Sequence, residues 1–407
     1  MTNKTFDIVV WGATGFTGRL VTEYLFKTYG TDGDLKWAIA GRNPAKLTQL
    51  NQDIADNTLP QIIADSDDEA SLRELVASTR AVCTTVGPYA LYGTKLVALC
   101  AELGTHYCDL TGEAPWMRQI IDDYGTGAEK SGTRIVHNCG FDCIPSDLGT
   151  YFVQSEMFKR HGVYATQVKF RVAGTAGGAS GGTIASMMNI MEEAKKDSSI
   201  FALMADPYAL NPPNLPRGED VGDQTGAQFD PDFGQWTGPF VMAGINTRVV
   251  RRSHALMGYP WGSGFRYDES VLTGSGPGGF FKAAMLAVGT AVLVGAMVFG
   301  PTRKLLGRIV PAPGEGPSRE AIENGYFKIE ILALHPTDPN KNIKALVTGD
   351  RDPGYGATSK MIAESAICLA KDDLDSAAGI LTPAVAMGQS LLDRLSRKAG
   401  MSFTIVE

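Results

Sequence analysis

Residues 6–18 read Phe-Asp-Ile-Val-Val-Trp-Gly-Ala-Thr-Gly-Phe-Thr-Gly, an apolar run that ends in three glycines spaced three apart. A helix-like segment follows over residues 16–29. The first glycine lets a strand turn sharply, the second lets the backbone approach a pyrophosphate, and the third lets the helix pack close to the strand. This order predicts a dinucleotide-binding Rossmann unit, the alternative being a tight turn without a ligand. The expected cofactor contacts are Gly12, Thr14, Gly15, Phe16 and Gly18.

A second predicted strand, residues 36–40, ends in Gly41-Arg42-Asn43. Units that bind NAD usually place an acidic residue here, which accepts a hydrogen bond from the ribose hydroxyl. Arg42 stands at this position instead, and a guanidinium forms two parallel hydrogen bonds with a phosphate. We therefore expect NADP(H), bound by Arg42 and Asn43; the alternative is a solvated arginine at a helix start.

The first third of the chain alternates strand and helix signals, as in a doubly wound parallel sheet. Further strands are expected at residues 61–65, 81–86, 106–110 and 134–138, which makes six. Ligands of such sheets lie at the carboxyl ends of the strands. Asp65 and the loop Val86-Gly87-Pro88 are therefore expected at the cofactor, although Asp65 could equally cap the next helix.

Composition excludes several functions. The 407 residues carry a net charge of −7, and no basic stripe with interleaved aromatic residues is present, so we expect no nucleic-acid partner. The six cysteines form no Cys-x-x-Cys pair, and the five histidines follow no metal-ligand pattern, so no metal is expected. Without a secretory signal at the start, a cytoplasmic location is expected.

The pattern changes near residue 140, and the fold class predicted is α/β with a second α+β domain. Longer strands of a mixed or antiparallel sheet are expected at residues 166–173, 246–253, 265–273, 326–334 and 344–348. A Gly/Ser/Thr-rich turn at 177–183 could hold an acyl carbonyl or phosphate, or form a close-packed crossover. The expected domains are residues 1–140 for the cofactor, 141–355 for the substrate, and a C-terminal helical segment at 356–407 that packs back on the body.

Residues 283–300 form an uncharged apolar run, flanked by Lys282 and by Arg303, Lys304 and Arg308. At 1.5 Å per residue its 18 residues reach about 27 Å, just short of a hydrocarbon core. Three interpretations stay open: a full span, a buried core helix, or a helix that touches a membrane surface. The flanking basic residues suit anionic headgroups.

Several motifs together resemble the saccharopine dehydrogenase-like oxidoreductases: Gly-Ala-Thr-Gly-Phe-Thr-Gly (12–18), Ala-Gly-Arg (40–42), Val-Gly-Pro-Tyr (86–89), Asp-Leu-Thr-Gly-Glu (109–113) and Gly-Phe-Asp (140–142). Later segments, at 180–187, 246–253, 352–355 and 381–384, are similar to the trans-acting enoyl reductases of mycobacterial lipid synthesis. The resemblance covers nearly the whole chain. It implies reduction of an enoyl double bond in a polyketide or fatty acyl lipid intermediate presented by a separate synthase.

Enoyl reduction needs a donor that polarises the thioester carbonyl and a proton for the α-carbon. Tyr89 follows the fourth strand and is the leading candidate donor, although its ring could simply pack against the cofactor. Asp142 and Tyr92 are weaker candidates for the catalytic donor.

Two other function classes remain open. The chain could be an NADPH-dependent, saccharopine dehydrogenase-like reductase of an imine or carbonyl. It could also be a non-catalytic NADP-binding protein at a lipid surface, for which the apolar run is the positive evidence.

Overall fold

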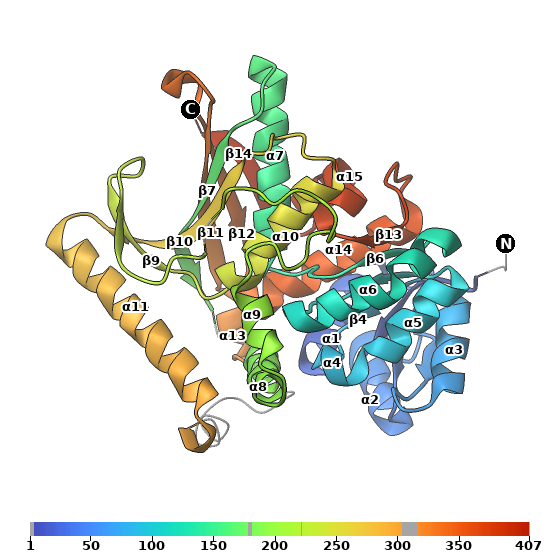
Figure 1. Cartoon of the computed structure of the whole chain (residues 1–407). Coiled ribbons are helices and arrows are strands. Elements are labelled where there is room, and N and C mark those ends of the chain that lie inside the picture. The colour runs from blue at the N-terminus through green and yellow to red at the C-terminus, as the bar shows by residue number, and fades with distance from the viewer. Residues whose placement is uncertain (1–3, 178–180, 221, 303–315, 407) are drawn as a thin grey trace.

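The computed structural model describes residues 4–177, 181–220, 222–302 and 316–406. Two seven-stranded sheets, A and B, stand side by side, with helices around both (Figure 1). The tip of the 177–183 turn (residues 178–180) and the basic residues Arg303, Lys304 and Arg308 lie outside the described residues.

Sheet A has the strand order β13-β6-β5-β4-β1-β2-β3, and all of its paired strands are parallel. Six strands match the expected ones, and the seventh, β13, arrives from the C-terminal part of the chain. The doubly wound α/β prediction is confirmed. The strands are β1 (Phe6–Trp11), β2 (Trp37–Gly41), β3 (Gln61–Ile63), β4 (Thr79–Thr84), β5 (His106–Cys108), β6 (Arg134–Val136) and β13 (Gly379–Leu381).

Helices cover both faces of sheet A, and the alternation within β1 shows why. Ile8 and Val10 point into one core with α1, α2 and α14, while Val9 and Trp11 point into another with α3, α5 and α6. Successive side chains of a strand face opposite sides of a sheet, so an uninterrupted apolar strand requires two covered faces. The helices are α1 (Phe16–Tyr29), α2 (Pro44–Ala55), α3 (Glu69–Ser78), α5 (Thr94–Leu103), α6 (Ala114–Ser131) and α14 (Thr358–Lys371).

Sheet B is mixed, with the order β14-β12-β11-β7-β10-β9-β8. Strands β7 and β10 pair in parallel, and the other neighbours are antiparallel, as expected for the second domain. The strands are β7 (Gln167–Ala176), β8 (Gln228–Asp230), β9 (Gln235–Pro239), β10 (Arg266–Gly274), β11 (Tyr326–Leu334), β12 (Ile343–Gly349) and β14 (Met401–Val406).

The remaining helices surround sheet B or join the two sheets. Residues 356–407 contribute strands as well as helices, because β13 extends sheet A and β14 extends sheet B. These elements are α7 (Ile144–His161), α8 (Gly181–Lys196), α9 (Ser199–Ala205), α10 (Ala243–Leu256), α11 (Gly276–Val298), α13 (Arg319–Glu323), α15 (Pro383–Lys398), a 3₁₀ turn (Pro339–Lys341) and a π turn (Pro353–Ala357).

The strand predicted at residues 246–253 is wrong, because this segment lies within helix α10. Its side chains are buried on all sides, so the sequence shows no helical alternation of polar and apolar residues. Its three arginines are satisfied inside the protein: Arg248 pairs with Asp223, Arg251 with Asp220, and Arg252 donates to the backbone carbonyls of residues 210 and 380. These arginines therefore hold the fold together.

Candidate active site

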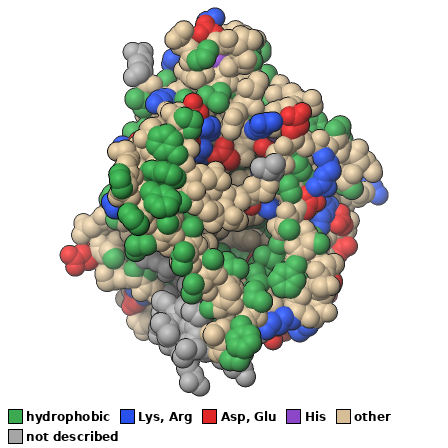
Figure 2. All heavy atoms as spheres, turned by 60° about the vertical axis from the view of Figure 1, so that its left-hand side comes forward, with side chains coloured by type: hydrophobic (Ala, Val, Ile, Leu, Met, Phe, Trp, Pro, Cys, Tyr) green, Lys and Arg blue, Asp and Glu red, His purple; other side chains and the backbone are tan. Residues whose placement is uncertain are grey.

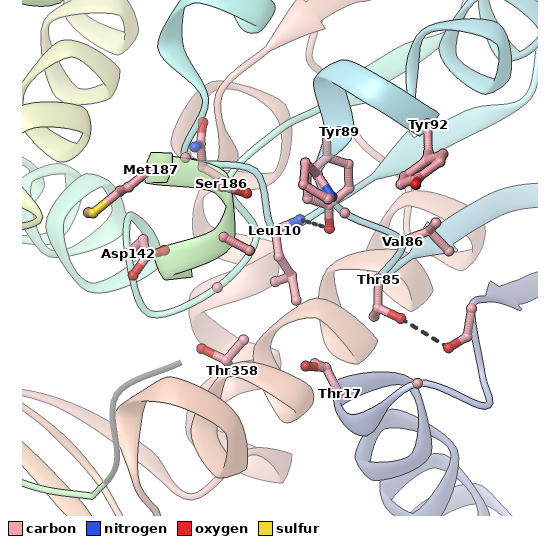
Figure 3. Close-up of a pocket in the computed structure, with 18 of the residues that line it drawn as sticks. Thr17, Thr85, Val86, Tyr89, Tyr92, Leu110, Asp142, Ser186, Met187 and Thr358 are labelled. Atoms are coloured by element: carbon pink, nitrogen blue, oxygen red, sulfur yellow. Dashed lines mark hydrogen bonds between the residues drawn. The ribbon is translucent and has the colours of Figure 1, made fainter. Parts of the chain in front are cut away.

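One cavity of about 650 Å³ lies at the carboxyl ends of β1, β2 and β4. Its walls come from both halves of the molecule. Sheet A supplies the glycine turn and the loops after β2 and β4, and α8, α9 and α11 supply the facing side. In Figure 3, Thr17, Thr85 and Tyr92 lie on one side of this space, and Asp142 and Met187 on the other.

The glycine turn has the geometry that a dinucleotide requires. Gly12 adopts φ +85°, and a Cβ there would lie 2.5 Å from a methyl of Val86. A Cβ on Gly18 would lie 2.1 Å from the Gly12 carbonyl oxygen, so this glycine allows α1 to pack on the turn. Gly15 occupies the N-cap of α1, where no described side chain caps the helix. The N-terminus of α1 is thus free to bind a phosphate.

Most of the residues predicted to bind the cofactor line this cavity. Arg42 and Asp65 stand at its rim, after β2 and β3. Asn43 is not among the lining residues, because its side chain caps α2 by accepting a hydrogen bond from the Lys46 N–H at 3.0 Å. The predicted residues in the wall are Gly12, Thr14, Gly15, Phe16, Arg42, Asp65, Val86, Gly87 and Pro88.

Tyr89 begins the short helix α4 (Tyr89–Tyr92), and its hydroxyl is held inside the wall. It donates to the Thr84 carbonyl at 3.3 Å and accepts from the Leu110 N–H at 3.2 Å (Figure 3). Burial, with the nearby Asp109 carboxylate, raises the pKa of Tyr89 well above its ordinary value. This arrangement fixes the loop after β4 against the loop after β5.

Glu113 is a buried residue that sequence reasoning did not select for a role. Its carboxylate accepts from the backbone N–H groups of Tyr89 and Ala90 at 2.8 and 2.9 Å. The hydroxyl of Ser186, on α8, donates to the same carboxylate at 2.8 Å. Burial raises the pKa of Glu113, and these hydrogen bonds partly offset the shift. The motif at 109–113 was visible in the sequence, but its link to a helix 73 residues away was not.

Asp142 lies in the turn before α7 and lines the cavity. Among the described residues its carboxyl has no hydrogen-bond partner, and burial raises its pKa to about 6. A carboxyl group with such a pKa holds its proton over part of the physiological pH range, so it can act as a general acid.

The rest of the wall is apolar. Met187, Ile190 and Met191 come from α8, and Val294 and Met297 come from α11. Methionine side chains adapt to flexible apolar ligands, so this side of the cavity suits an alkyl chain. In the described part of the chain, no group of three or more His, Cys, Asp or Glu residues could hold a metal ion.

Comparison with known proteins agrees with this geometry. Residues 8–136 match the family model "Saccharopine dehydrogenase NADP binding domain". The Mycobacterium tuberculosis (strain H37Rv) protein Rv2449c, which carries a provisional trans-acting enoyl reductase name, is 40% identical over 98% of this chain and 97% of its own. A trans-acting enoyl reductase of Mycobacterium ulcerans is 35% identical over 96% of each chain.

A solved structure also shares the fold. Apo saccharopine dehydrogenase (L-Glu forming) from Saccharomyces cerevisiae covers 98% of this chain and 99% of its own, with a TM-score of 0.53 and 12% identity.

The Rossmann sheet, the glycine turn and the matched domain together define an NADP-dependent oxidoreductase, with NADP(H) as its cofactor. Within that class, the chain belongs to the trans-acting enoyl reductase family of saccharopine dehydrogenase-like proteins.

Proposed function

We propose that this protein is an NADPH-dependent enoyl reductase that acts in trans on a polyketide or fatty acyl chain held by a separate synthase. The observation that carries the proposal is a single cavity in which the dinucleotide-binding turn faces the apolar side chains of α8 and α11. The names of the relatives favour the same reaction. We place the protein in the cytoplasm, with peripheral contact to the inner face of the membrane.

The reaction adds two hydrogens across a double bond conjugated to a thioester. When bound, NADPH supplies a hydride to the β-carbon, and a proton from the protein or solvent reaches the α-carbon. The glycine turn, the N-terminus of α1 and Arg42 would hold the phosphates, and the loop at 86–88 would lie beside the reacting ring.

Asp142 is the proposed proton donor to the α-carbon. It lines the cavity, its carboxyl is unpaired among the described residues, and its pKa of about 6 allows it to give up a proton near neutral pH. It would be reloaded from solvent between turnovers.

Tyr89 is proposed to position the loop after β4. To polarise a substrate carbonyl, its hydroxyl would have to release the Thr84 carbonyl or the Leu110 N–H. A role as carbonyl donor therefore stays a prediction, which Tyr89→Phe can test separately from Asp142→Asn.

The experiment that tests the proposal is a comparison of substrates under one set of conditions. The protein with NADPH should convert an α,β-unsaturated acyl thioester to the saturated thioester, with stoichiometric loss of NADPH absorbance. Reduction of an imine or a ketone, with the enoyl thioester left unchanged, would replace this function by the saccharopine dehydrogenase-like alternative.

A further inference from the structure

Helix α11 (Gly276–Val298) lies along the edge of the molecule, largely uncovered (Figure 1). It is 23 residues long, and its length and composition would allow it to cross a membrane, yet only 11% of its most apolar window is buried. It packs on β9 and β10 near its start and on α8 near its end. Phe299, which follows the helix, is also exposed. The exposed large apolar residues of this segment are Phe280, Phe281, Met285, Val288, Val292, Leu293, Val294, Val298 and Phe299.

The exposed side chains form a continuous face. Ala283 and Met297 are buried toward the body. At helical spacing, Phe281, Met285 and Val292 fall on the opposite side, where their exposed fractions are 65%, 75% and 65%. Figure 2 turns this side of the molecule toward the reader and shows hydrophobic side chains gathered beside a hollow. Contiguous apolar surface of this kind marks a site of interaction with a protein or a membrane.

Two features favour a lipid surface over a protein partner. From residue 283 to 300 the only polar side chain is that of Thr290, so the face lacks the polar rim of a protein interface. Between Glu269 and Glu315 the sequence has four basic residues and no acidic one, although the whole chain carries a charge of −7. Basic residues beside an apolar helix are attracted to anionic lipid headgroups.

One further basic side chain, that of Lys195, comes from the neighbouring helix. Lys195 and Lys196 end α8; Lys196 pairs with Glu193 over 2.8 Å, and the Lys195 ammonium lies 3.7 Å from the point that a Cβ of Gly300 would occupy. Positive charge therefore stands at the far end of α11 in space as well as in sequence.

The topology excludes a full crossing. Strand β10 precedes α11 and β11 follows it, and both pair with β7 in sheet B. If α11 crossed a bilayer, the connection from Phe299 to Gly325 would have to cross back, but it contains four basic and three acidic residues. A helix that binds a bilayer in this position would therefore lie in the plane of its surface.

The same helix also reaches the active site. Val294 and Met297 of α11 line the cavity together with Met187 and Met191 of α8. We propose that α11 is a docking surface for an anionic lipid bilayer, and that the acyl chain enters the cavity between α8 and α11 without passing through water. Binding of α11 to a bilayer is inferred from its exposed apolar face and the nearby basic residues alone. Entry of the acyl chain, in contrast, rests on the proposed enoyl reductase function.

Vesicle flotation tests the docking step. Wild-type protein should float with vesicles of phosphatidylcholine and phosphatidylglycerol, and less with phosphatidylcholine alone or at high salt. Met285→Asp and Val292→Asp, each on the outer face, should reduce the bound fraction by roughly tenfold or more, because a carboxylate must be transferred into the interface. Val406→Asp, at an exposed apolar position on edge strand β14, is the matched control and should float as the wild type does.

Two further readouts separate the possible results. NADPH binding and reduction of a short, water-soluble enoyl thioester should be unchanged in both α11 variants, whereas reduction of a long-chain enoyl thioester embedded in vesicles should fall with the bound fraction. Docking is overturned if wild-type protein stays unbound, or if it forms a dimer that Val292→Asp dissociates, which would make α11 an interface between copies. Flotation without reduction of any thioester would leave docking standing and refute the enoyl reductase function.

Discussion

The hydroxyl of Ser186 donates a hydrogen bond to the carboxylate of Glu113 over 2.8 Å. This contact joins α8, which lines the apolar side of the cavity, to the loop that would lie beside the cofactor, because Glu113 also binds the N–H groups of Tyr89 and Ala90. The two halves of the active site are thus connected through one buried carboxylate.

Ser186→Ala should loosen that connection. Loss of one hydrogen bond to a charged group corresponds to about 1.5–3 kcal/mol, so kcat/KM for the acyl thioester should fall by at least roughly tenfold. The dissociation constant for NADPH, measured by fluorescence titration, should change little. Ser186→Thr retains the hydroxyl and should recover most of the activity; equal losses in both variants would point to packing of α8 instead.

Arg42→Ala should remove the preference for NADPH. A charged hydrogen bond to the 2′-phosphate is worth about 1.5–3 kcal/mol, which corresponds to roughly 10- to 150-fold in affinity. Calorimetric titration of NADPH and NADH into both proteins checks this, with Arg42→Lys expected to lie between them. Wild-type protein that binds both cofactors equally would contradict the assignment of Arg42.

Asp142→Asn should abolish the proton donor and yet stabilise the fold. The folded pKa of about 6 is above the ordinary value of 3.8, so between these values the unfolded chain loses its proton while the folded protein keeps it. The contribution of Asp142 to stability is therefore greatest at acidic pH and falls as pH rises through about 6. At pH near 8 the variant should be more stable by about 3 kcal/mol, and near pH 4 the difference should nearly vanish.

Thermal melting of both proteins across this pH range gives the stability difference. If Asp142 supplies the proton, the wild-type rate should also fall as pH rises above about 6. An Asp142→Asn variant with wild-type turnover would show that Asp142 is not the proton donor.

Tyr89→Phe should destabilise the fold and largely preserve turnover, which is the opposite of what is expected for Asp142→Asn. Because the hydroxyl bonds to the Thr84 carbonyl and the Leu110 N–H, its loss leaves these groups partly unsatisfied and should reduce the free energy of unfolding by about 1–3 kcal/mol. Turnover of the folded variant should decrease only a few-fold. A loss of kcat by two or more orders of magnitude, with NADPH affinity retained, would instead support Tyr89 as the carbonyl donor.

The sequence predicted those parts of the fold that depend on local pattern. The glycine turn at 12–18 could be predicted because the strand, the tight turn and the start of the helix are adjacent in the chain. The outer sheet strand β13 was missed because three residues pair with β6 only after some 240 intervening residues have folded. Helix α10 was misread because burial on every side removes the alternation on which sequence interpretation depends.

The candidate site also contains residues that the sequence predicts and residues that it does not. Arg42 and the loop at 86–88 could be predicted, since they follow strands in a known order. The link between Glu113 and Ser186, and the place of Val294 and Met297 in the cavity wall, depend on packing between distant segments. No local signal specifies such contacts.

Reduction of an enoyl thioester can be followed with NADPH that carries deuterium at the transferred position. The expected product is a saturated acyl thioester with one deuterium at the β-carbon, formed in proportion to the NADP⁺ released and identified by mass spectrometry. An unchanged enoyl thioester, in a preparation that transfers the deuterium to an imine or ketone carbon, would contradict the proposed enoyl reduction.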